Sequence, residues 1–181
     1  IMPNEIEYFL DNMHNNKYRI DARMMLEFSI KGKTEVAFND IVITRKSIQN
    51  MARIDAKIDD EIFNSYYGDG LIISTPTGST AYNLSSGGPL VYPLLDALIM
   101  TPISPHSLTQ RPLILPSGFN IGLTSGNENN LMVIVDGQDT FELDFDDEIT
   151  ISMARKKAIL IHREERNYFK VLSTKLNWGQ D

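Results

Sequence analysis

The sequence predicts a mainly β fold, a layered β-sandwich-like domain with a few short helices. Short apolar or alternating segments, each of about four to eight residues, recur at hairpin-like intervals along most of the chain. Helical periodicity is confined to brief stretches, which does not suit an alternating α/β sheet. The 181 residues are 42% hydrophobic, enough to form the core of one domain, and we expect residues 1–181 to be a single β-rich domain.

Composition excludes several classes of protein and site. There are no cysteines, so disulfides, thiolate catalysis and cysteine-bound zinc are excluded. Acidic residues outnumber basic ones by 24 to 17, which argues against nucleic-acid and anionic-membrane binding. The three histidines lie far apart in the sequence, so no metal site is predicted. No stretch resembles a membrane span or a signal peptide, and we expect a cytoplasmic protein.

The first predicted element is a helix over residues 4–15. Asn4 with Glu7 forms a capping-box pattern at its start. Apolar residues at helical spacing predict a stripe that faces the core, comprising Ile6, Phe9, Leu10 and Met13.

Strands dominate from residue 24 onward. Residues 24–30 alternate, Gly32 marks a turn, and Val36 to Thr44 is the expected return strand of a hairpin. Residues 53–58 alternate again, and Asp136-Gly137 predicts a hairpin turn. Further strands are predicted over 70–74, 97–101, 113–115, 120–124, 132–136, 140–144, 148–152 and 158–163.

The chain is organised around residues 67–89. A short apolar strand, Leu71 to Ile73, leads through a Pro-Thr-Gly turn into a helix that Thr77 or Ser79 could cap. Gly87-Gly88-Pro89 ends that helix after about two turns. Such a turn can present amides and hydroxyls to a polar ligand, or can be structural only. The spacing of a P-loop and that of a dinucleotide fingerprint are both absent.

A second polar feature interrupts an apolar run. Asn39-Asp40 lies within Val36 to Ile43, where adjacent polar residues must find partners or line a pocket. A β-bulge or an exposed strand end is the structural alternative.

Several ordered motifs resemble those of the NAD kinases, and the similarity covers nearly the whole chain. The motifs are Asp69-Gly-Leu-Ile-Ile-Ser-Thr-Pro-Thr-Gly-Ser-Thr-Ala-Tyr82 with Gly87-Gly88-Pro89, Thr101-Pro-Ile-Ser-Pro-His-Ser-Leu108 with Arg111-Pro112, Asp136-Gly-Gln138, and Lys175-Leu-Asn-Trp-Gly179. The resemblance implies the NAD-binding C-terminal domain of a kinase that transfers a phosphoryl group from ATP to the adenosine-ribose 2′-hydroxyl of NAD. It also implies a β-rich layered fold.

The resemblance further implies what this chain lacks. Family members carry an upstream α/β domain with a Gly-Gly-Asp-Gly motif, which supplies the base and the phosphate-binding loop, and nothing here matches it. We therefore expect the C-terminal domain alone, with no catalytic residue in this chain and little activity by itself. Magnesium is expected to arrive with ATP.

The resemblance also implies the NAD-binding residues. Asn39 and Asp40 would bind the adenosine part, and Asp69 and Ser104 would lie near the nicotinamide end. The sequence has Asp40 where the family has Glu, and Tyr67 where members often have Arg or Lys. The full predicted set is Asn39, Asp40, Asp69, Thr80, Ala81, Tyr82, Asn83, Leu84, Ser85, Ser104 and Gln138.

The resemblance also implies the partners of the chain, and two other functions remain as alternatives. NAD, NADP and ATP are the expected ligands, in a homodimer or homotetramer where Asp69 and Ser104 complete a neighbour's site. One alternative is a non-catalytic nucleotide-sensing or assembly module. Another is a related lipid kinase domain, which the absence of a basic membrane-facing patch disfavours. Donor preference, NADH tolerance and feedback regulation have no signature in the sequence.

Overall fold

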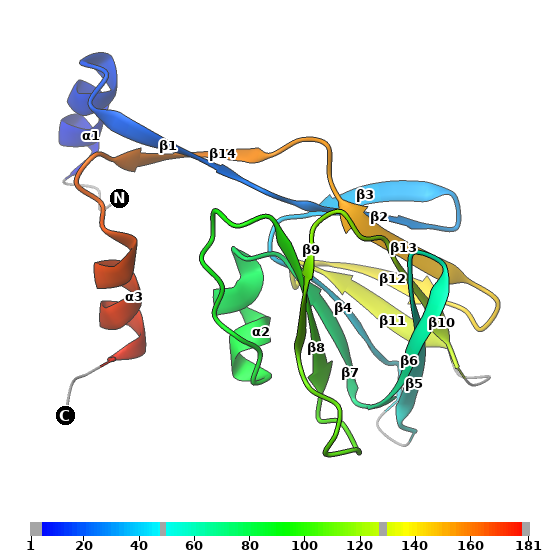
Figure 1. The fold of residues 1–181 in the computed structure, drawn as a ribbon. Helices are drawn as coiled ribbons and strands as arrows, with labels where there is room; N and C mark the ends of the chain where they lie inside the picture. The colour runs from blue at the N-terminus through cyan, green and yellow to red at the C-terminus, as the bar shows by residue number, and fades with distance from the viewer. Residues whose placement is uncertain (1–4, 48–49, 127–129, 179–181) are drawn as a thin grey trace. The chain divides into compact units, whose positions relative to one another are not determined.

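The computed structural model describes residues 5–47, 50–126 and 130–178. These residues form two compact units, coloured along the chain in Figure 1. The larger unit is Arg23–Ala158, and the smaller combines the described parts of 1–22 and 159–181. The expected single domain over 1–181 stays a prediction.

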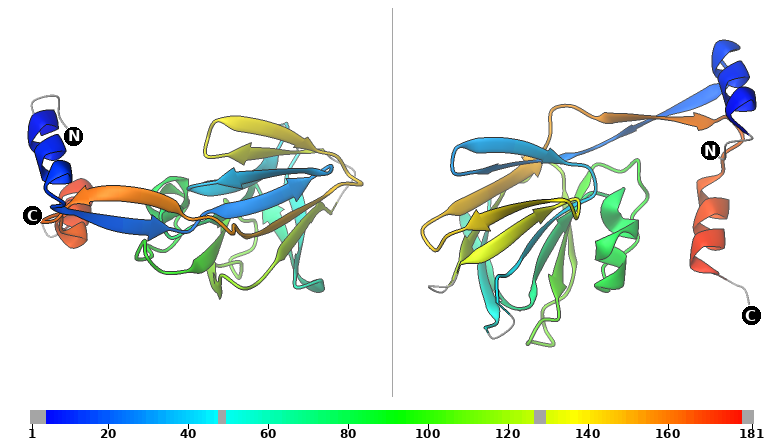
Figure 2. Two further views of the ribbon diagram at one scale, coloured as in Figure 1. Left: turned by 90° about the horizontal axis from the view of Figure 1, so that it is seen from above. Right: turned by 180° about the vertical axis from the view of Figure 1, so that it is seen from behind.

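The larger unit consists of two antiparallel six-stranded sheets, which confirms the predicted mainly β sandwich. Figures 1 and 2 show the two sheets layered face to face. In the first sheet the order is β3 (Lys33–Ala37), β2 (Leu26–Ile30), β13 (Glu148–Met153), β10 (Ile121–Ser125), β5 (Ala52–Ile58) and β6 (Glu61–Gly68). In the second it is β12 (Asp139–Leu143), β11 (Leu131–Val135), β4 (Asp40–Arg45), β7 (Gly70–Ser74), β8 (Ala97–Ile103) and β9 (Leu113–Pro116).

The core lies between these sheets because their strands alternate in polarity. In β2, Leu26, Phe28 and Ile30 are buried while the residues between them are half-exposed. Phe28 packs edge-on against Phe141 of the opposite sheet, with ring centroids 5.6 Å apart. Burial of apolar surface of this kind is the main driving force for folding.

The outer face of the second sheet carries a smaller apolar cluster. Val42 and Ile72 are buried there with Ile103, and Ile134 packs against them. The 3₁₀ helix η2 (Gly78–Thr80) and the short helix α2 (Tyr82–Ser85) follow β7. Thr101 of β8 donates to the side chain of Asn83 at 2.6 Å, so α2 is fastened to this sheet (Figure 1).

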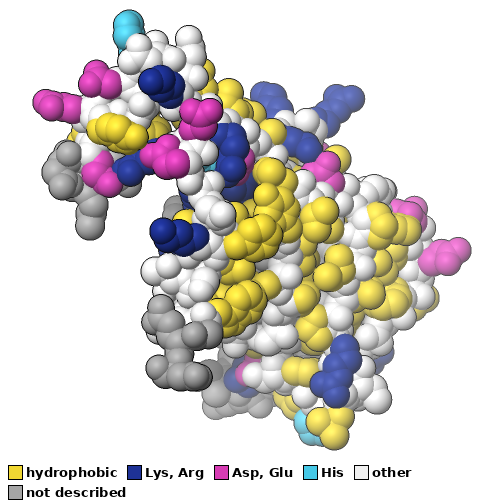
Figure 3. Space-filling model, turned by 60° about the vertical axis from the view of Figure 1, so that its left-hand side comes forward, with side chains coloured by type: hydrophobic (Ala, Val, Ile, Leu, Met, Phe, Trp, Pro, Cys, Tyr) yellow, Lys and Arg dark blue, Asp and Glu magenta, His cyan; other side chains and the backbone are white. Residues whose placement is uncertain are grey.

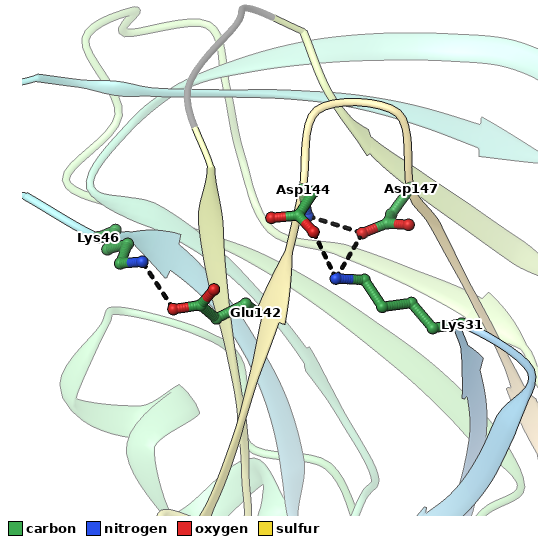
Figure 4. Close-up of polar contacts among 5 residues, drawn as sticks. All are labelled: Lys31, Lys46, Glu142, Asp144 and Asp147. Carbon is green, nitrogen blue, oxygen red and sulfur yellow. Dashed lines mark hydrogen bonds and ion pairs between the residues drawn. The ribbon is translucent and has the colours of Figure 1, made fainter.

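Exposed ion pairs lie at the edge of the sandwich (Figure 4). Lys31, in the β2–β3 turn, lies 2.5 Å from Asp144 and 3.0 Å from Asp147. Hydrogen bonding from Lys31 lowers the pKa of Asp147. Lys46 pairs with Glu142 at 2.6 Å. Such exposed pairs add little to stability, so the fold depends on the core.

The smaller unit has two helices and a two-stranded sheet. These are α1 (Ile6–His14), α3 (Tyr168–Leu176), and the paired strands β1 (Tyr18–Arg23) and β14 (Ala158–Arg163). Asn167 caps α3 by accepting the Lys170 N–H at 3.1 Å. His162 lies 3.3 Å from the buried Asp21.

Three predictions of local structure need correction. The stripe on the first helix is not buried in the described structure, since no residue of α1 is buried; its predicted cap, Asn4, lies outside the described residues. The predicted return strand over 36–44 is divided between β3 and β4, which belong to different sheets. Strands β1 and β6 and helix α3 were not predicted; Glu61–Gly68 of β6 mixes apolar, polar and aromatic residues without regular alternation.

Candidate functional site

The Asn39–Asp40 pair lies where the chain leaves one sheet and enters the other. The carboxylate of Asp136 accepts three backbone N–H groups there, from Phe38 at 2.8 Å, Asn39 at 2.7 Å and Asp40 at 3.1 Å. On the other side, the Asn39 carbonyl accepts the Thr75 N–H at 2.9 Å. This crossing explains why two polar residues interrupt an apolar run, and it places them on a defined backbone.

The turn that presents Asp136 is the predicted hairpin turn. Asp136 and Gly137 have φ values of 50° and 68°, and the Gln138 N–H donates to the Val135 carbonyl at 2.9 Å. Positive φ at both central positions defines a type I′ turn, which favours Asp or Asn followed by Gly. Asp136-Gly137 therefore adopts the backbone conformation of the turn, and the Asp136 carboxylate accepts hydrogen bonds from residues 38–40.

A pocket of about 390 Å³ opens beside this junction. Its wall combines the outer face of β4 and β11, the hairpin turn and the start of α2. It is lined by Asn39, Asp40, Val42, Ala81, Tyr82, Ile134, Asp136 and Gly137.

Asp40 gives this pocket its electrostatic character. Only 4% of the residue is exposed, and burial raises the pKa of its carboxyl to about 6, with a further contribution from the charge of Asp136. A buried carboxylate gains from hydroxyl donors that a ligand brings, because they replace lost water. The pocket therefore suits a ligand with an apolar face and neighbouring hydroxyl groups.

The predicted helix cap after β7 is absent from the described structure, and three hydroxyl side chains there are buried. Ser74, Thr75 and Ser79 are fully buried. The Thr75 hydroxyl accepts the Gly78 N–H at 3.0 Å, and the Ser79 hydroxyl accepts the Val91 N–H at 3.1 Å, so Ser79 is bonded outside the predicted helix start. Neither η2 nor α2 has a side-chain cap. A Cβ on Gly78 would lie 2.0 Å from the Asn39 carbonyl oxygen, so this close approach requires glycine.

The predicted segment from Thr80 to Ser85 divides into exposed and buried residues. Thr80, Ala81, Tyr82 and Ser85 are exposed, Leu84 is half-buried, and Asn83 is fully buried. Asn83 donates to the carbonyls of Ser79 and Pro89, both at 3.1 Å, and accepts from Thr101. Its contacts in this structure are therefore those of a residue that fixes α2.

Asp69 and Ser104 lie together at the opposite end of β7. The Asp69 N–H donates to the Ile103 carbonyl at 2.9 Å, and Ser104 follows in a left-handed conformation with φ of 43°. The Asp69 carboxylate is 2.9 Å from Arg45. Asp40 pairs with Ser74 at one end of the strand, and Asp69 precedes Gly70 at the other. That separation is roughly 17 Å at the rise of an antiparallel strand.

The structure therefore brings some predicted residues together and separates others. Asn39, Asp40, Ala81 and Tyr82 share the pocket; Gln138 is exposed beside it, in the same turn as Asp136. Sequence reasoning missed Val42, Ile134, Asp136 and Gly137 as lining residues. Asp136 was detectable in principle, because an Asp-Gly turn sets a carboxylate at a strand end, but its partner segment was not.

The described part of the chain contains neither a cluster of metal-ligating side chains nor a membrane-spanning helix. No group of three or more His, Cys, Asp or Glu side chains there could hold a metal ion. The residues present thus do not fit a protein-held magnesium ion. No described helix is both long and apolar enough to cross a bilayer.

Comparison with known proteins agrees with the fold. Residues 38–163 match the family described as ATP-NAD kinase C-terminal domain. The NAD kinase of Sulfurimonas denitrificans is 47% identical over 97% of this chain and 63% of its own length. The NAD kinase of Wolinella succinogenes is 45% identical over 99% of this chain and 63% of its own length.

Two solved structures have the same fold. The yeast NADH kinase complexed with NADH superposes with a TM-score of 0.92 and 31% identity, covering 98% of this chain and 54% of that one. An Archaeoglobus fulgidus NAD kinase in complex with ATP superposes with a TM-score of 0.82 and 27% identity, covering 97% of this chain and 67% of that one. The chain spans less than two thirds of the length of the curated relatives named above, and it belongs to the ATP-NAD kinase family.

Proposed function

We propose that this chain forms the NAD-binding part of an NAD kinase, which transfers a phosphoryl group from ATP to the adenosine-ribose 2′-hydroxyl of NAD. The observation that carries the proposal is the buried Asp40 carboxylate beside Asn39, facing a pocket that Tyr82 also lines. Names of relatives and of ligand-bound neighbours support the same assignment.

The pocket suits the adenosine end of NAD. A carboxylate accepts hydrogen bonds from ribose hydroxyls, and the Asn39 amide can both donate and accept. The exposed ring of Tyr82 and the apolar floor of Val42 and Ile134 suit a nucleobase. Positioning of this kind is what phosphoryl transfer demands of its acceptor site.

The remaining parts of the reaction are not assigned to residues of this chain. We name no catalytic residue here, and ATP with its magnesium ion is proposed to bind elsewhere in the complete protein. The proposed location is the cytoplasm.

Self-association is the second part of the proposal. Asp69 and Ser104 lie at the opposite end of β7 from Asp40, and we propose that they complete the NAD site of a neighbouring subunit. Figure 3 shows hydrophobic side chains gathered on one face of the sandwich unit. Exposed apolar residues of this unit include Ile62 and Leu108, at 87% and 85% exposure. Contiguous exposed apolar surface can mark an interaction site.

Calorimetric titration tests the proposal. NAD, NADP and ATP are titrated separately into the wild-type chain and into Asn39→Ala, with Gly118→Ala as a control at an open site. We expect NAD to bind the wild type and the control, and to bind Asn39→Ala about tenfold more weakly or worse. Equal NAD affinity in all three proteins would contradict the proposed pocket.

A further inference from the structure

We propose that Asp136 is a positioning residue of the nucleotide site. Its carboxylate fixes the backbone of residues 38–40 and thereby sets where the side chains of Asn39 and Asp40 meet the ligand. The identity of that ligand rests on the proposed function, whereas the positioning itself follows from the contacts below.

The first argument is the number of backbone donors that one side chain satisfies. Residues 38 and 39 belong to neither sheet, because β3 ends at Ala37 and β4 begins at Asp40. Their N–H groups therefore lack strand partners, and Asp136 accepts both, together with that of Asp40. Hydrogen bonds to an ionised acceptor are stronger than neutral ones, so this carboxylate is the principal restraint on that side.

The second argument is that the opposite side of the segment is restrained independently. The Thr75 hydroxyl donates to the Phe38 carbonyl at 2.8 Å, and the Thr75 N–H donates to the Asn39 carbonyl. Asp136 closes the arrangement by donating its own N–H to the Asp40 carbonyl at 3.0 Å. The carbonyls of Phe38 and Asn39 are thus fixed by the loop after β7, whereas the Asp40 carbonyl and the three amide groups are fixed by the hairpin turn.

The third argument is that the turn and the carboxylate are separable. Asn and Gly both suit the left-handed φ of 50° at this position. Asp136→Asn retains the shape of the side chain but replaces one acceptor oxygen by a donor group, which faces backbone donors. Asp136→Gly retains the turn and removes the side chain entirely. Both variants should fold, so a loss at the site can be read separately from a loss of the hairpin.

Amide hydrogen exchange measures the positioning without any nucleotide. In Asp136→Asn and Asp136→Gly, we expect the amides of residues 38–40 to exchange at least about tenfold faster than in the wild type. The amides of β4 beyond Asp40 should keep their protection. Asp139→Asn makes the same change of charge at an exposed residue of the same hairpin and should alter neither set.

Calorimetry then measures the consequence for the site. We expect Asp136→Asn to weaken NAD binding about 10- to 100-fold, and Asp139→Asn to leave it unchanged. In a background that already carries Asn39→Ala and Asp40→Ala, Asp136→Asn should have little further effect, because it acts through those residues.

The outcomes separate the two claims. Unchanged protection of residues 38–40 in both Asp136 variants would overturn the positioning role, whatever happens to affinity. Lost protection with unchanged NAD affinity would overturn its relevance to the site, as would a full effect in the double-variant background. If the wild-type chain fails to bind NAD, the proposed function falls, and the exchange data alone still decide whether Asp136 fixes this segment.

Discussion

An aspartate lies beside each end of β7, Asp40 on the neighbouring strand β4 and Asp69 just before the strand, and the two differ in environment. Asp40, paired with Ser74, is 4% exposed and has a raised pKa. Asp69, just before Gly70, has a side chain that is 39% exposed and forms an ion pair with Arg45. A buried carboxylate without a cation costs stability when it ionises, whereas an exposed pair is close to neutral. Ionised Asp40 therefore lowers stability, which is expected of a carboxylate that faces the proposed NAD site.

The largest expected effect on stability comes from disrupting the close approach of Gly78 to the Asn39 carbonyl. In Gly78→Ala, the new Cβ would lie 2.0 Å from the Asn39 carbonyl oxygen, which is backbone and cannot rotate away. We expect a loss of about 3 kcal/mol or more in the free energy of unfolding, measured by urea denaturation. Gly118→Ala, whose Cβ would meet nothing within 4 Å, is the control and should cost far less. Equal losses would contradict the packing described here.

A smaller effect is expected from the titration of Asp40. Its pKa is raised from 3.8 to about 6 on folding, so the folded state binds the proton more tightly than the unfolded state. The associated stability is fully present below pH 3.8 and is lost as the pH rises through about 6. The loss is up to about 3 kcal/mol for a shift of this size.

Asp40→Asn should remove that pH dependence. We expect the variant to be more stable than the wild type at pH 8, with the advantage vanishing toward pH 4, as measured by thermal unfolding across this range. A difference between the two proteins that stays constant with pH would show that Asp40 ionises as it does in water.

The smallest effect on stability is expected at the other end of the strand. Asp69→Ala removes an exposed ion pair, so the free energy of unfolding should change by less than about 1 kcal/mol. NAD affinity should nevertheless fall about 10- to 150-fold, because a charge-assisted hydrogen bond to the ligand is lost. Asp96→Ala removes a comparable exposed pair with Lys157 and should leave NAD affinity unchanged. A large drop in melting temperature with no change in affinity would indicate a structural role for Asp69.

Much of the fold was predictable because alternation encodes burial directly. Strand β7 was predicted at its exact bounds, since the unbroken apolar run from Leu71 to Ile73 suits a strand buried on both faces. The division of residues 36–44 between two sheets could not be predicted. It depends on Asp136, about a hundred residues later, accepting the amides where the strands separate.

The site was predictable in part for the same reason. Asn39 and Asp40 were recognised because polar residues in an apolar run need an explanation, and the structure gives them one. The hydroxyl-rich loop was harder to interpret: Ser74, Thr75 and Ser79 are as polar as Thr80 and Ser85, yet the first three are buried and the others exposed. Only tertiary contacts distinguish them. Sequence motifs indicated the candidate site, but they could not show which residues of the motif are buried behind it.

The central claim is that the two ends of β7 serve one NAD site through two copies of the chain. Mixing Asn39→Ala with Asp69→Ala and titrating NAD by calorimetry tests it most directly. Each variant alone should bind NAD weakly. In a mixed dimer, one site has both defects and the other has neither, so refolding the two together should restore wild-type affinity at about a quarter of the sites. A mixture that binds NAD no better than its two components would contradict a site shared between subunits.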